Sequence, residues 1–185
     1  AATSAAWNAK KGVAFALAAH SREALEPHLP SLVPTLYRHS FDPNPRIGTP
    51  MKALWSALVP DAKATLSVHF DAVLAHLLAG LGDRAWRARE ASALALAELV
   101  PQCDAGNFTA QAAVLFRAIL RALDDIKESV RNASQGAWRA LCSATNRLSD
   151  GGTSSPADAR AVLDAILPIL LDKGLTHPEA EVRAL

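Results

Sequence analysis

The sequence is poor in aromatic residues, and this scarcity bears on its fold. Aromatic residues make up 5% of the 185 positions, whereas half of all positions are apolar and alanine dominates among them. Alanine and leucine lose little side-chain entropy in a helix, and the β-branched and aromatic residues that favour strands are scarce. The composition therefore predicts an all-α fold.

An excess of charge of either sign is also missing. The chain has 19 basic and 18 acidic residues, which gives a formal net charge of +1, and the basic residues are spread along the sequence. Nucleic-acid-binding domains concentrate lysine and arginine on one face, and anionic membranes attract the same kind of patch. We therefore expect no nucleic-acid partner.

Long apolar runs and a cysteine framework are absent as well. The sequence has no apolar run long enough to span a bilayer, which argues against direct membrane insertion, and residues 1–11 lack the pattern of a signal peptide. Cys103 and Cys142 lie 39 positions apart, which is more typical of reduced thiols than of a disulfide. These features favour a cytoplasmic and nuclear location.

A repeated helical pattern is the strongest signal in the sequence. In the stretch that opens at Asp125, Val130-Arg131 is followed by small or apolar residues at 133, 137, 141 and 144. Steps of three and four place these residues on one helix face. The same order recurs after the aspartates at 42, 83 and 172.

The recurrence has a nearly constant period. The equivalent positions are 47, 88, 130 and 182, which are 41, 42 and 52 residues apart. The last interval is longer because it contains a flexible insertion, 149–156. An amphipathic helix is predicted before each second helix, at His28–Ser40, Val68–Leu81, Thr109–Leu123 and Ala157–Leu171. Their apolar side chains, Val114 among them, are expected to face the core.

This period identifies the class of fold. Units of about 40–47 residues with two helices each are typical of HEAT and armadillo repeats. Because no single pair can cover its own apolar face, such pairs stack into an α-solenoid. The sequence predicts one array of HEAT-like helix pairs over 1–185, in units 1–22 (partial), 23–60, 66–100, 108–149 and 156–185 (partial). An ordinary helical bundle is the alternative.

Charged residues recur in register with the repeats. Aspartates are expected in the turns between paired helices and arginines at the start of second helices: Asp42, Asp83, Asp125 and Asp172, with Arg89, Arg131 and Arg183. We expect a structural ladder in which each arginine bonds a turn carboxylate. A catalytic acid beside an anion-binding arginine is the other interpretation, but it would need further converging groups.

One unit departs from this register. Gly48 stands where the pattern requires arginine, and Pro50 follows it. We expect the second helix of this unit to begin late or to be distorted, and its ladder contact to be missing. Prolines 30, 34 and 168 predict bends or later starts in the first helices.

No motif for catalysis, metal binding or phosphate binding is present. The sequence has no HExxH, paired CxxC, GxGxxG or GKS/T, and neither cysteine lies in a nucleophile motif. His69 and His76 share a helix face but stand too far apart to hold one metal. We therefore expect a protein that is not an enzyme and has no cofactor, metal site or small-molecule substrate.

A polar stripe on two of the second helices is the candidate partner surface. Its six residues are Thr49, Lys52, Ser56, Asn132, Gln135 and Arg139. They lie opposite the apolar stripe, and a merely solvated helix face is the alternative interpretation. The four tryptophans are interpreted as packing anchors, with a surface role for one of them as the alternative.

Several runs of residues resemble one family. They are Trp7-Asn8, Leu36-Tyr37-Arg38, Phe41-Asp42-Pro43-Asn44, Trp86-Arg87-Ala88-Arg89-Glu90 and, most specifically, 124–131. Over nearly its whole length the chain is similar to an internal stretch of the HEAT-repeat proteasome adaptors and scaffolds of the extracellular-mutant-29 family. The resemblance implies a non-enzymatic scaffold that binds subunits of the proteasome regulatory and core particles and supports proteasome assembly, stability or quality control. A HEAT-repeat scaffold of another class, such as a nuclear transport receptor or a phosphatase scaffold, is the alternative.

Overall fold

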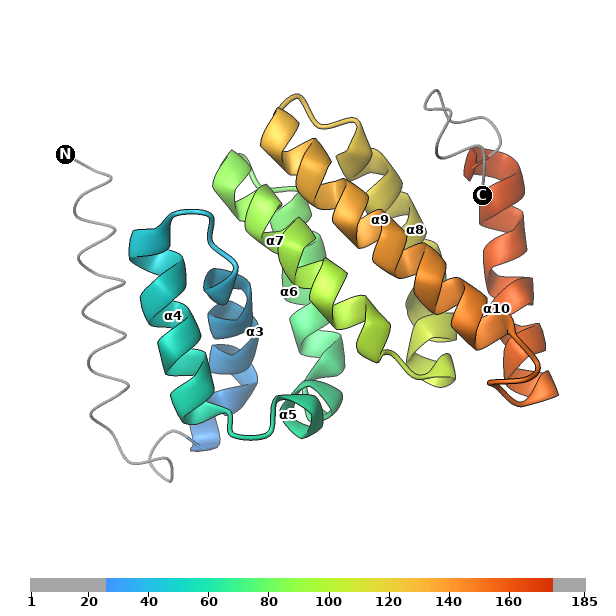
Figure 1. The fold of residues 1–185 in the computed structure, drawn as a ribbon, viewed down its shortest axis with the longest axis horizontal. Coiled ribbons are helices and arrows are strands. Elements are labelled where there is room, and N and C mark those ends of the chain that lie inside the picture. Colours follow the sequence, from blue (N-terminus) through green and yellow to red (C-terminus); the bar gives the residue numbers. More distant parts are fainter. Residues whose placement is uncertain (1–25, 175–185) are drawn as a thin grey trace. The chain divides into compact units, whose positions relative to one another are not determined.

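The computed structural model describes residues 26–174, which form helices joined by short loops and contain no strand (Figure 1). In chain order the elements are η1 (Glu26–His28), α3 (Leu29–Ser40), α4 (Pro45–Leu58), α5 (Ala62–Val68), α6 (Phe70–Leu81), α7 (Trp86–Leu99), η2 (Val100–Gln102), α8 (Ala105–Leu123), α9 (Glu128–Ser149), α10 (Pro156–Ile169) and the π-helical turn η3 (Leu170–Gly174). The all-α prediction is confirmed. Successive helices form the pairs of a helical-repeat solenoid: α3 with α4, α6 with α7, and α8 with α9.

The chain divides into two compact units, 1–95 and 96–185, and each is described by itself. The predicted bounds of the repeats within one array stay a prediction. The partial unit predicted at 1–22, and the last residues of the unit predicted at 156–185, lie outside the described residues.

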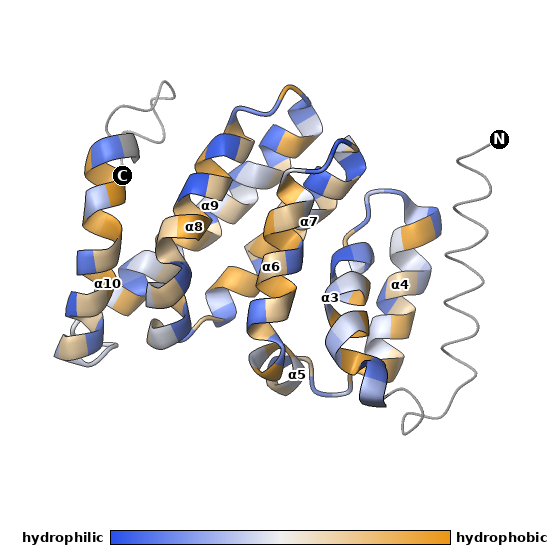
Figure 2. Ribbon diagram, turned by 180° about the vertical axis from the view of Figure 1, so that it is seen from behind, coloured by the Kyte–Doolittle hydropathy of each residue, from blue (hydrophilic) through white to orange (hydrophobic). Residues whose placement is uncertain are grey.

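Tyr37 joins three helices of the first unit. Its ring centroid lies 5.1 Å from that of Trp55 on α4 and 5.2 Å from that of Phe41, and its hydroxyl donates to the main-chain carbonyl of Ala95 at 3.4 Å. Hydrophobic and hydrophilic residues alternate along the surrounding helices, as one buried face requires (Figure 2). The buried side chains occupy predicted inward positions, namely Val33, Leu36, Met51, Leu54, Val73, Leu74 and Leu77.

The short helix α5 was not foreseen by the repeat pattern. Asp61 caps it, since its carboxylate accepts from the amide of Ala64 at 2.9 Å. The chain then bends by 83° at His69 before α6 begins, so the helix predicted to start at Val68 starts at Phe70. Pro60-Asp61 followed by a helix-favouring run was the local signal for α5.

The second unit is built on α8, α9 and α10. The inward stripe predicted for α9 is confirmed, because Ala133, Ala137, Leu141 and Ala144 are all buried. Phe116 on α8 meets Trp138 on α9 edge to face, with 5.8 Å between the ring centroids. The expectation that Val114 is buried is wrong. It is 48% exposed because the buried face of α8 runs through residues 108, 112, 115 and 119 instead.

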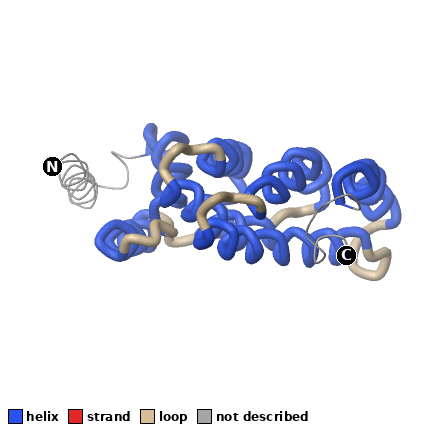
Figure 3. Tube along the Cα trace, turned by 90° about the horizontal axis from the view of Figure 1, so that it is seen from above, coloured by secondary structure: helices blue, strands red, loops and turns tan. Residues whose placement is uncertain are grey.

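Aspartates begin the corners between paired helices, where the loops are short (Figure 3). Each carboxylate accepts from the amide two residues later, which is an Asx turn. The three bonds are Asp42 with Asn44 at 2.9 Å, Asp83 with Ala85 at 2.8 Å and Asp125 with Lys127 at 2.8 Å. The aspartates therefore shape the turns directly.

The ladder arginines reach the same corners through the main chain. Nη1 of Arg131 donates to the backbone carbonyl of Asp125 at 2.8 Å, and Nη1 of Arg89 donates to the carbonyls of Asp83 at 2.9 Å and Arg84 at 3.1 Å. We had expected carboxylates as acceptors of these bonds. Carbonyls after a helix C-terminus lack intrahelical partners, which suits a cationic donor. A ladder that runs from repeat to repeat stays a prediction.

The two remaining ladder positions lie at the end of the chain. Asp172 is exposed within η3, and Arg183 lies outside the described residues. The π-helical turn itself follows directly on α10 and begins two residues after Pro168.

The expectation of a late start for α4 is wrong. The helix begins at Pro45, directly after its cap residue Asn44, and continues through Pro50 to Leu58. A Cβ atom on Gly48 would lie 2.5 Å from the main-chain oxygen of Asp42. The corner carbonyl that arginine binds in the later repeats here packs against the glycine, so no side chain fits between them.

We predict that Arg131→Ala lowers the free energy of unfolding by about 1–2 kcal/mol. The substitution removes a charge-assisted hydrogen bond from a half-buried arginine to the corner carbonyl of Asp125. Arg139→Ala, on the exposed side of the same helix, should change the free energy of unfolding by less than about 0.5 kcal/mol. Urea denaturation of both variants and the parent tests this, and equal midpoints for all three would contradict it.

We also predict that Gly48→Ala destabilises the chain by about 1–3 kcal/mol, because the new methyl group collides with the Asp42 carbonyl. Gly136→Ala is the matched control, since the added Cβ would lie 3.9 Å from that of Ala97, an ordinary contact. The control should be neutral or stabilising by up to about 1 kcal/mol, as alanine favours helix. Thermal melts test this. The melting temperature of the Gly48→Ala variant should fall below that of the parent, and that of the Gly136→Ala variant should stay the same or rise.

Candidate functional site

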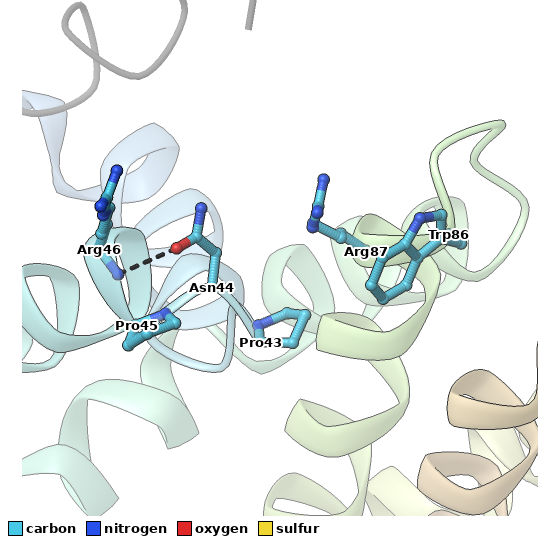
Figure 4. Close-up of a pocket in the computed structure, with 6 residues that line it drawn as sticks. All are labelled: Pro43, Asn44, Pro45, Arg46, Trp86 and Arg87. Atoms are coloured by element: carbon cyan, nitrogen blue, oxygen red, sulfur yellow. Dashed lines mark hydrogen bonds between the residues drawn. The ribbon is translucent and has the colours of Figure 1, made fainter. Parts of the chain in front are cut away.

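A surface pocket of about 380 Å³ lies in the first unit, where two helix pairs present their corners (Figure 4). The turn between α3 and α4 supplies one side, and the first residues of α7 supply the other. The lining residues are Pro43, Asn44, Pro45, Arg46, Trp86 and Arg87. We call this site the corner pocket. Its lining includes two arginines and no acidic residue.

The α4 side of the corner pocket is shaped by a helix cap. The side-chain oxygen of Asn44 accepts from the amide of Arg46 at 3.1 Å, and Pro45 occupies the first helical position. Proline there fixes its own backbone angle and needs no hydrogen-bond donor. Together with the Asx turn of Asp42, these features hold the pocket wall in one backbone conformation.

The α7 side of the corner pocket carries a cation–π pair. The guanidinium carbon of Arg87 lies 4.7 Å from the ring centroid of Trp86, a cation–π contact. In Figure 4 the side chains of Arg46 and Arg87 point the same way from the two walls, with Asn44 between them. The pocket thus has a cationic rim above the rings of Pro43 and Pro45.

A polar contact between α3 and α6 lies within the same unit. Nε of Arg38 donates to Nε2 of His76 at 3.1 Å, so His76 accepts through a neutral ring nitrogen. Burial lowers the pKa of Arg38, while the charges of Asp83 and Asp42 act in the opposite direction. Burial and the charge of Arg38 lower the pKa of His76. Arg38 therefore lies within electrostatic reach of both corner aspartates.

Gly80 makes room for this contact. A Cβ atom there would lie 3.3 Å from Cδ of Arg38 and would collide with Oγ of Ser92. Ser92 is fully buried and donates to the carbonyl of Ala88 at 2.8 Å. The small residues at 80 and 92 thus allow α6 to approach α7 closely beside the arginine.

The structure places all six residues of the predicted partner stripe at the surface: Thr49, Lys52, Ser56, Asn132, Gln135 and Arg139. Three lie on α4 in the first unit and three on α9 in the second, so each set is considered by itself. The ammonium of Lys52 lies 6.0 Å from the ring centroid of Phe41. Exposure is what a partner surface requires, and binding by these residues stays a prediction.

The two thiols are poorly suited to chemistry. Burial raises the pKa of Cys103 to about 12, and the charge of Asp104 adds to the effect. Burial raises the pKa of Cys142 to about 11. Because the thiolate is the reactive form, neither cysteine is an activated nucleophile near neutral pH.

Residues 26–174 contain no group of three or more histidine, cysteine or acidic side chains placed to hold a metal ion. In this range no single helix is long and apolar enough to cross a membrane, although the bent pair α5–α6 meets the criteria of length and composition when taken together.

Sequence reasoning missed the corner pocket, although a signal for it exists. Arg46 and Arg87 each stand four positions after a turn aspartate, and they are 41 residues apart, one repeat. The inward stripe and the ladder do not include these positions, which lie on the outward side of the corners. Residue 129, the next position in this register, is serine, so the pair is confined to the first two corners.

The contact between Arg38 and His76 predicts a dependence of stability on pH. Because the pKa of His76 is lowered in the folded state, its contribution is fully present above the ordinary value of about 6.5 and is lost as the pH falls below it. The free energy of unfolding should therefore fall between pH 7.5 and 5.5. His76→Gln keeps an acceptor and removes the titration, so its pH profile should be flatter. Urea denaturation across this range tests the difference, and parallel profiles would refute it.

Comparison with known proteins gives matches along nearly the whole chain. The human proteasome adapter and scaffold protein ECM29 is 38% identical over 184 residues, and the Saccharomyces cerevisiae proteasome component ECM29 is 34% identical over 191 residues; each match covers 98% of this chain. The Drosophila melanogaster proteasome-associated protein ECM29 homolog is 31% identical over 206 residues and covers 97%. No family model matches the chain, and no solved structure matches it.

These relatives are much longer than the chain. The matches cover 10% of the human and yeast proteins and 11% of the fly protein. The relatives are named as adapter, scaffold or component proteins, which agrees with the prediction of a protein that is not an enzyme. The chain belongs to the ECM29 family of proteasome adapters and scaffolds, and it spans about a tenth of the length of these relatives.

Proposed function

We propose that the chain is a non-enzymatic scaffold segment that takes part in binding the proteasome, through subunits of its regulatory and core particles. The observation that carries this proposal is the match over 98% of the chain to proteins named for proteasome adaptation and scaffolding. We further propose that the binding supports proteasome assembly, stability or quality control in the cytoplasm and nucleus. The free thiols of Cys103 and Cys142 fit those reducing compartments.

The build of the second helices supports a role in binding proteins. On α9 the inward side is mostly apolar, while the outward side presents Asn132, Gln135 and Arg139 to solvent. A helix that is fixed by one face and polar on the other offers a rigid surface of hydrogen-bond donors and acceptors. Stacked repeats use such surfaces for extended contacts with partners.

The alternative of another HEAT-repeat scaffold is less well supported. Nuclear transport receptors and phosphatase scaffolds share the architecture, and architecture alone does not decide function. The named relatives from human, yeast and fly all carry proteasome names, and the match runs along the whole chain rather than along one generic repeat. We therefore favour the proteasome as the partner.

We predict that the tagged chain retains purified proteasome holoenzymes on a resin above the level of a tag-only control. A variant with Asn132→Glu, Gln135→Glu and Arg139→Glu should retain at least about tenfold less, since tenfold corresponds to about 1.4 kcal/mol and acidic charges at an interface core cost a few kcal/mol in all. Arg117→Glu is the control, because Arg117 is exposed on α8 outside the stripe. Retained subunits are quantified by mass spectrometry, and circular dichroism confirms that each variant is folded.

Each result of the retention experiment has a distinct meaning. Retention of regulatory and core particle subunits by the parent and by the Arg117 variant supports the proposal. No enrichment of any proteasome subunit over the tag-only control would refute it for this segment. Equal retention by the triple variant would remove the α9 stripe from the interface.

A further inference from the structure

The loop that joins α9 to α10 is the part of the second unit that the repeat pattern does not explain (Figure 1). It occupies 149–156 and lengthens the interval between equivalent positions from 41 or 42 residues to 52. None of its residues is buried, so the packing of the unit does not account for it. Its sequence is Ser-Asp-Gly-Gly-Thr-Ser-Ser-Pro, which is rich in the hydroxyl groups that accept phosphate.

The last serine of this loop lies in a recognisable motif. Ser155 is followed directly by Pro156, and both residues are exposed. Proline-directed kinases prefer this order, because proline has no amide hydrogen and fits a kinase site that offers no acceptor there. One other hydroxyl residue of the sequence precedes a proline, namely Thr49 before Pro50. The chain therefore carries the same dipeptide motif in two places.

Backbone conformation separates the two motifs. Ser155 has a φ of −61° and a ψ of 148°, which is the extended conformation that residues before proline favour. Thr49 lies inside the helix α4, so its backbone is helical. A kinase takes its substrate segment in extended form, since the acceptor hydroxyl must reach the γ-phosphate in line with the leaving oxygen. Ser155 is already presented in that form, whereas Thr49 is not.

The contacts that hold the loop are local. The main-chain carbonyl of Asp150 accepts from the amides of Thr153 at 3.0 Å and Ser154 at 2.9 Å. The hydroxyl of Ser155 accepts from the amide of Asp158 at 3.1 Å and donates to its carboxylate at 2.7 Å. These bonds join near neighbours in the sequence. The loop can therefore open into a kinase site without exposing the apolar core.

The charges around the motif narrow the class of kinase. Between Arg147 and Arg160 the chain has two aspartates and no lysine or arginine, which excludes kinases that require a basic residue close to the acceptor. Asp158 stands three residues after Ser155, as acid-directed kinases require. Its carboxylate accepts from the Ser155 hydroxyl in the first turn of α10, so it must leave the helix to be recognised. Pro156 is exposed beside the acceptor and favours a proline-directed kinase.

We propose that Ser155 is the acceptor site of a proline-directed protein kinase. The hydroxyl of Ser155 gives its proton to the catalytic carboxylate of the kinase, and Oγ forms a bond to the γ-phosphorus of ATP. The bond between that phosphorus and the bridging oxygen breaks, and ADP leaves with the electron pair. The products are phosphoserine and ADP. This modification goes beyond the proposed function and does not rest on it.

Phosphorylation would change the start of α10 in a defined way. A phosphate ester carries no proton on Oγ, so the bond from Ser155 to the carboxylate of Asp158 is lost and two negative groups become neighbours. The amide of Asp158 can still donate to a phosphate oxygen at the helix N-terminus. The exposed loop would gain about −1.5 to −2 charges near neutral pH, and the packing of α9 and α10 would stay as it is.

The test compares the two motifs within one folded molecule. The 185-residue chain is incubated with ATP and a purified mitogen-activated protein kinase, and mass spectrometry follows phosphate at Ser155 and Thr49. Ser155 should be modified at least about tenfold faster, since α4 must open locally to present Thr49. In synthetic peptides of 43–56 and 149–162 the helix is removed, so the two rates should differ by less than about threefold.

Variants of the chain identify the residues that direct the kinase. Pro156→Ala should lower the rate at Ser155 about tenfold, because the preferred residue is removed. Asp158→Asn should leave that rate unchanged or raise it, since it removes the carboxylate that holds the hydroxyl. Ser154→Ala is the matched control, because its hydroxyl lies in the same loop but does not precede a proline. Ser155→Thr should still be modified. Circular dichroism shows that each variant is folded.

Three results would overturn the proposal. They are equal rates at Ser155 and Thr49 in the folded chain, a Pro156→Ala variant that is modified as fast as the parent, and faster modification of Ser155 by a purified acid-directed kinase than by the proline-directed one. No proteasome is present in this assay, so its outcome is independent of the retention experiment.

Discussion

The corner between paired helices is the constraint on which the described repeats depend. There the chain must reverse direction within a few residues, and the carbonyls that end the first helix are left without intrahelical partners. In the corners at 83 and 125 an aspartate closes the turn through its carboxylate, while an arginine six residues later satisfies its carbonyl. The aspartate thus makes two contacts at the corner: its carboxylate closes the turn, and its carbonyl accepts from the arginine of the second helix. The second helix is then set at a fixed angle, with its apolar stripe turned toward the first.

The corner at 42 solves the same problem without the cation. Glycine at 48 lets the carbonyl of Asp42 approach the helix backbone itself, and Asn44 supplies a cap at the start of α4. Arg46 lies at the rim of the corner pocket, on the opposite wall from Trp86 and Arg87 (Figure 4). The corner that lacks the ladder arginine is therefore also a corner that lines the pocket.

The sequence predicted the parts of this structure that depend on periodicity. Helix pairs, the inward stripe of α9 and the class of fold all follow from apolar residues that recur every three or four positions. Features that depend on a single contact could not be predicted from the sequence. Arg131 donates to the main-chain carbonyl of Asp125, and the start of α4 depends on Asn44 and Pro45 rather than on Gly48. The corner pocket depends on residues brought together from two repeats, although its arginines share a register that a comparison of outward positions reveals.

The close approach at Gly80 and Ser92 has a consequence for how the sequence of this region can change over time. A side chain at 80 would occupy the space of the serine oxygen, so the two positions share one volume. Substitution at 80 alone meets a steric barrier, whereas a prior exchange of serine for glycine at 92 removes the collision with the serine and leaves the 3.3 Å contact with Cδ of Arg38. The order of the two changes therefore matters, and the two residues are expected to vary as a pair. Arg38, which passes beside both, links this packing pair to the charge on the corner aspartates.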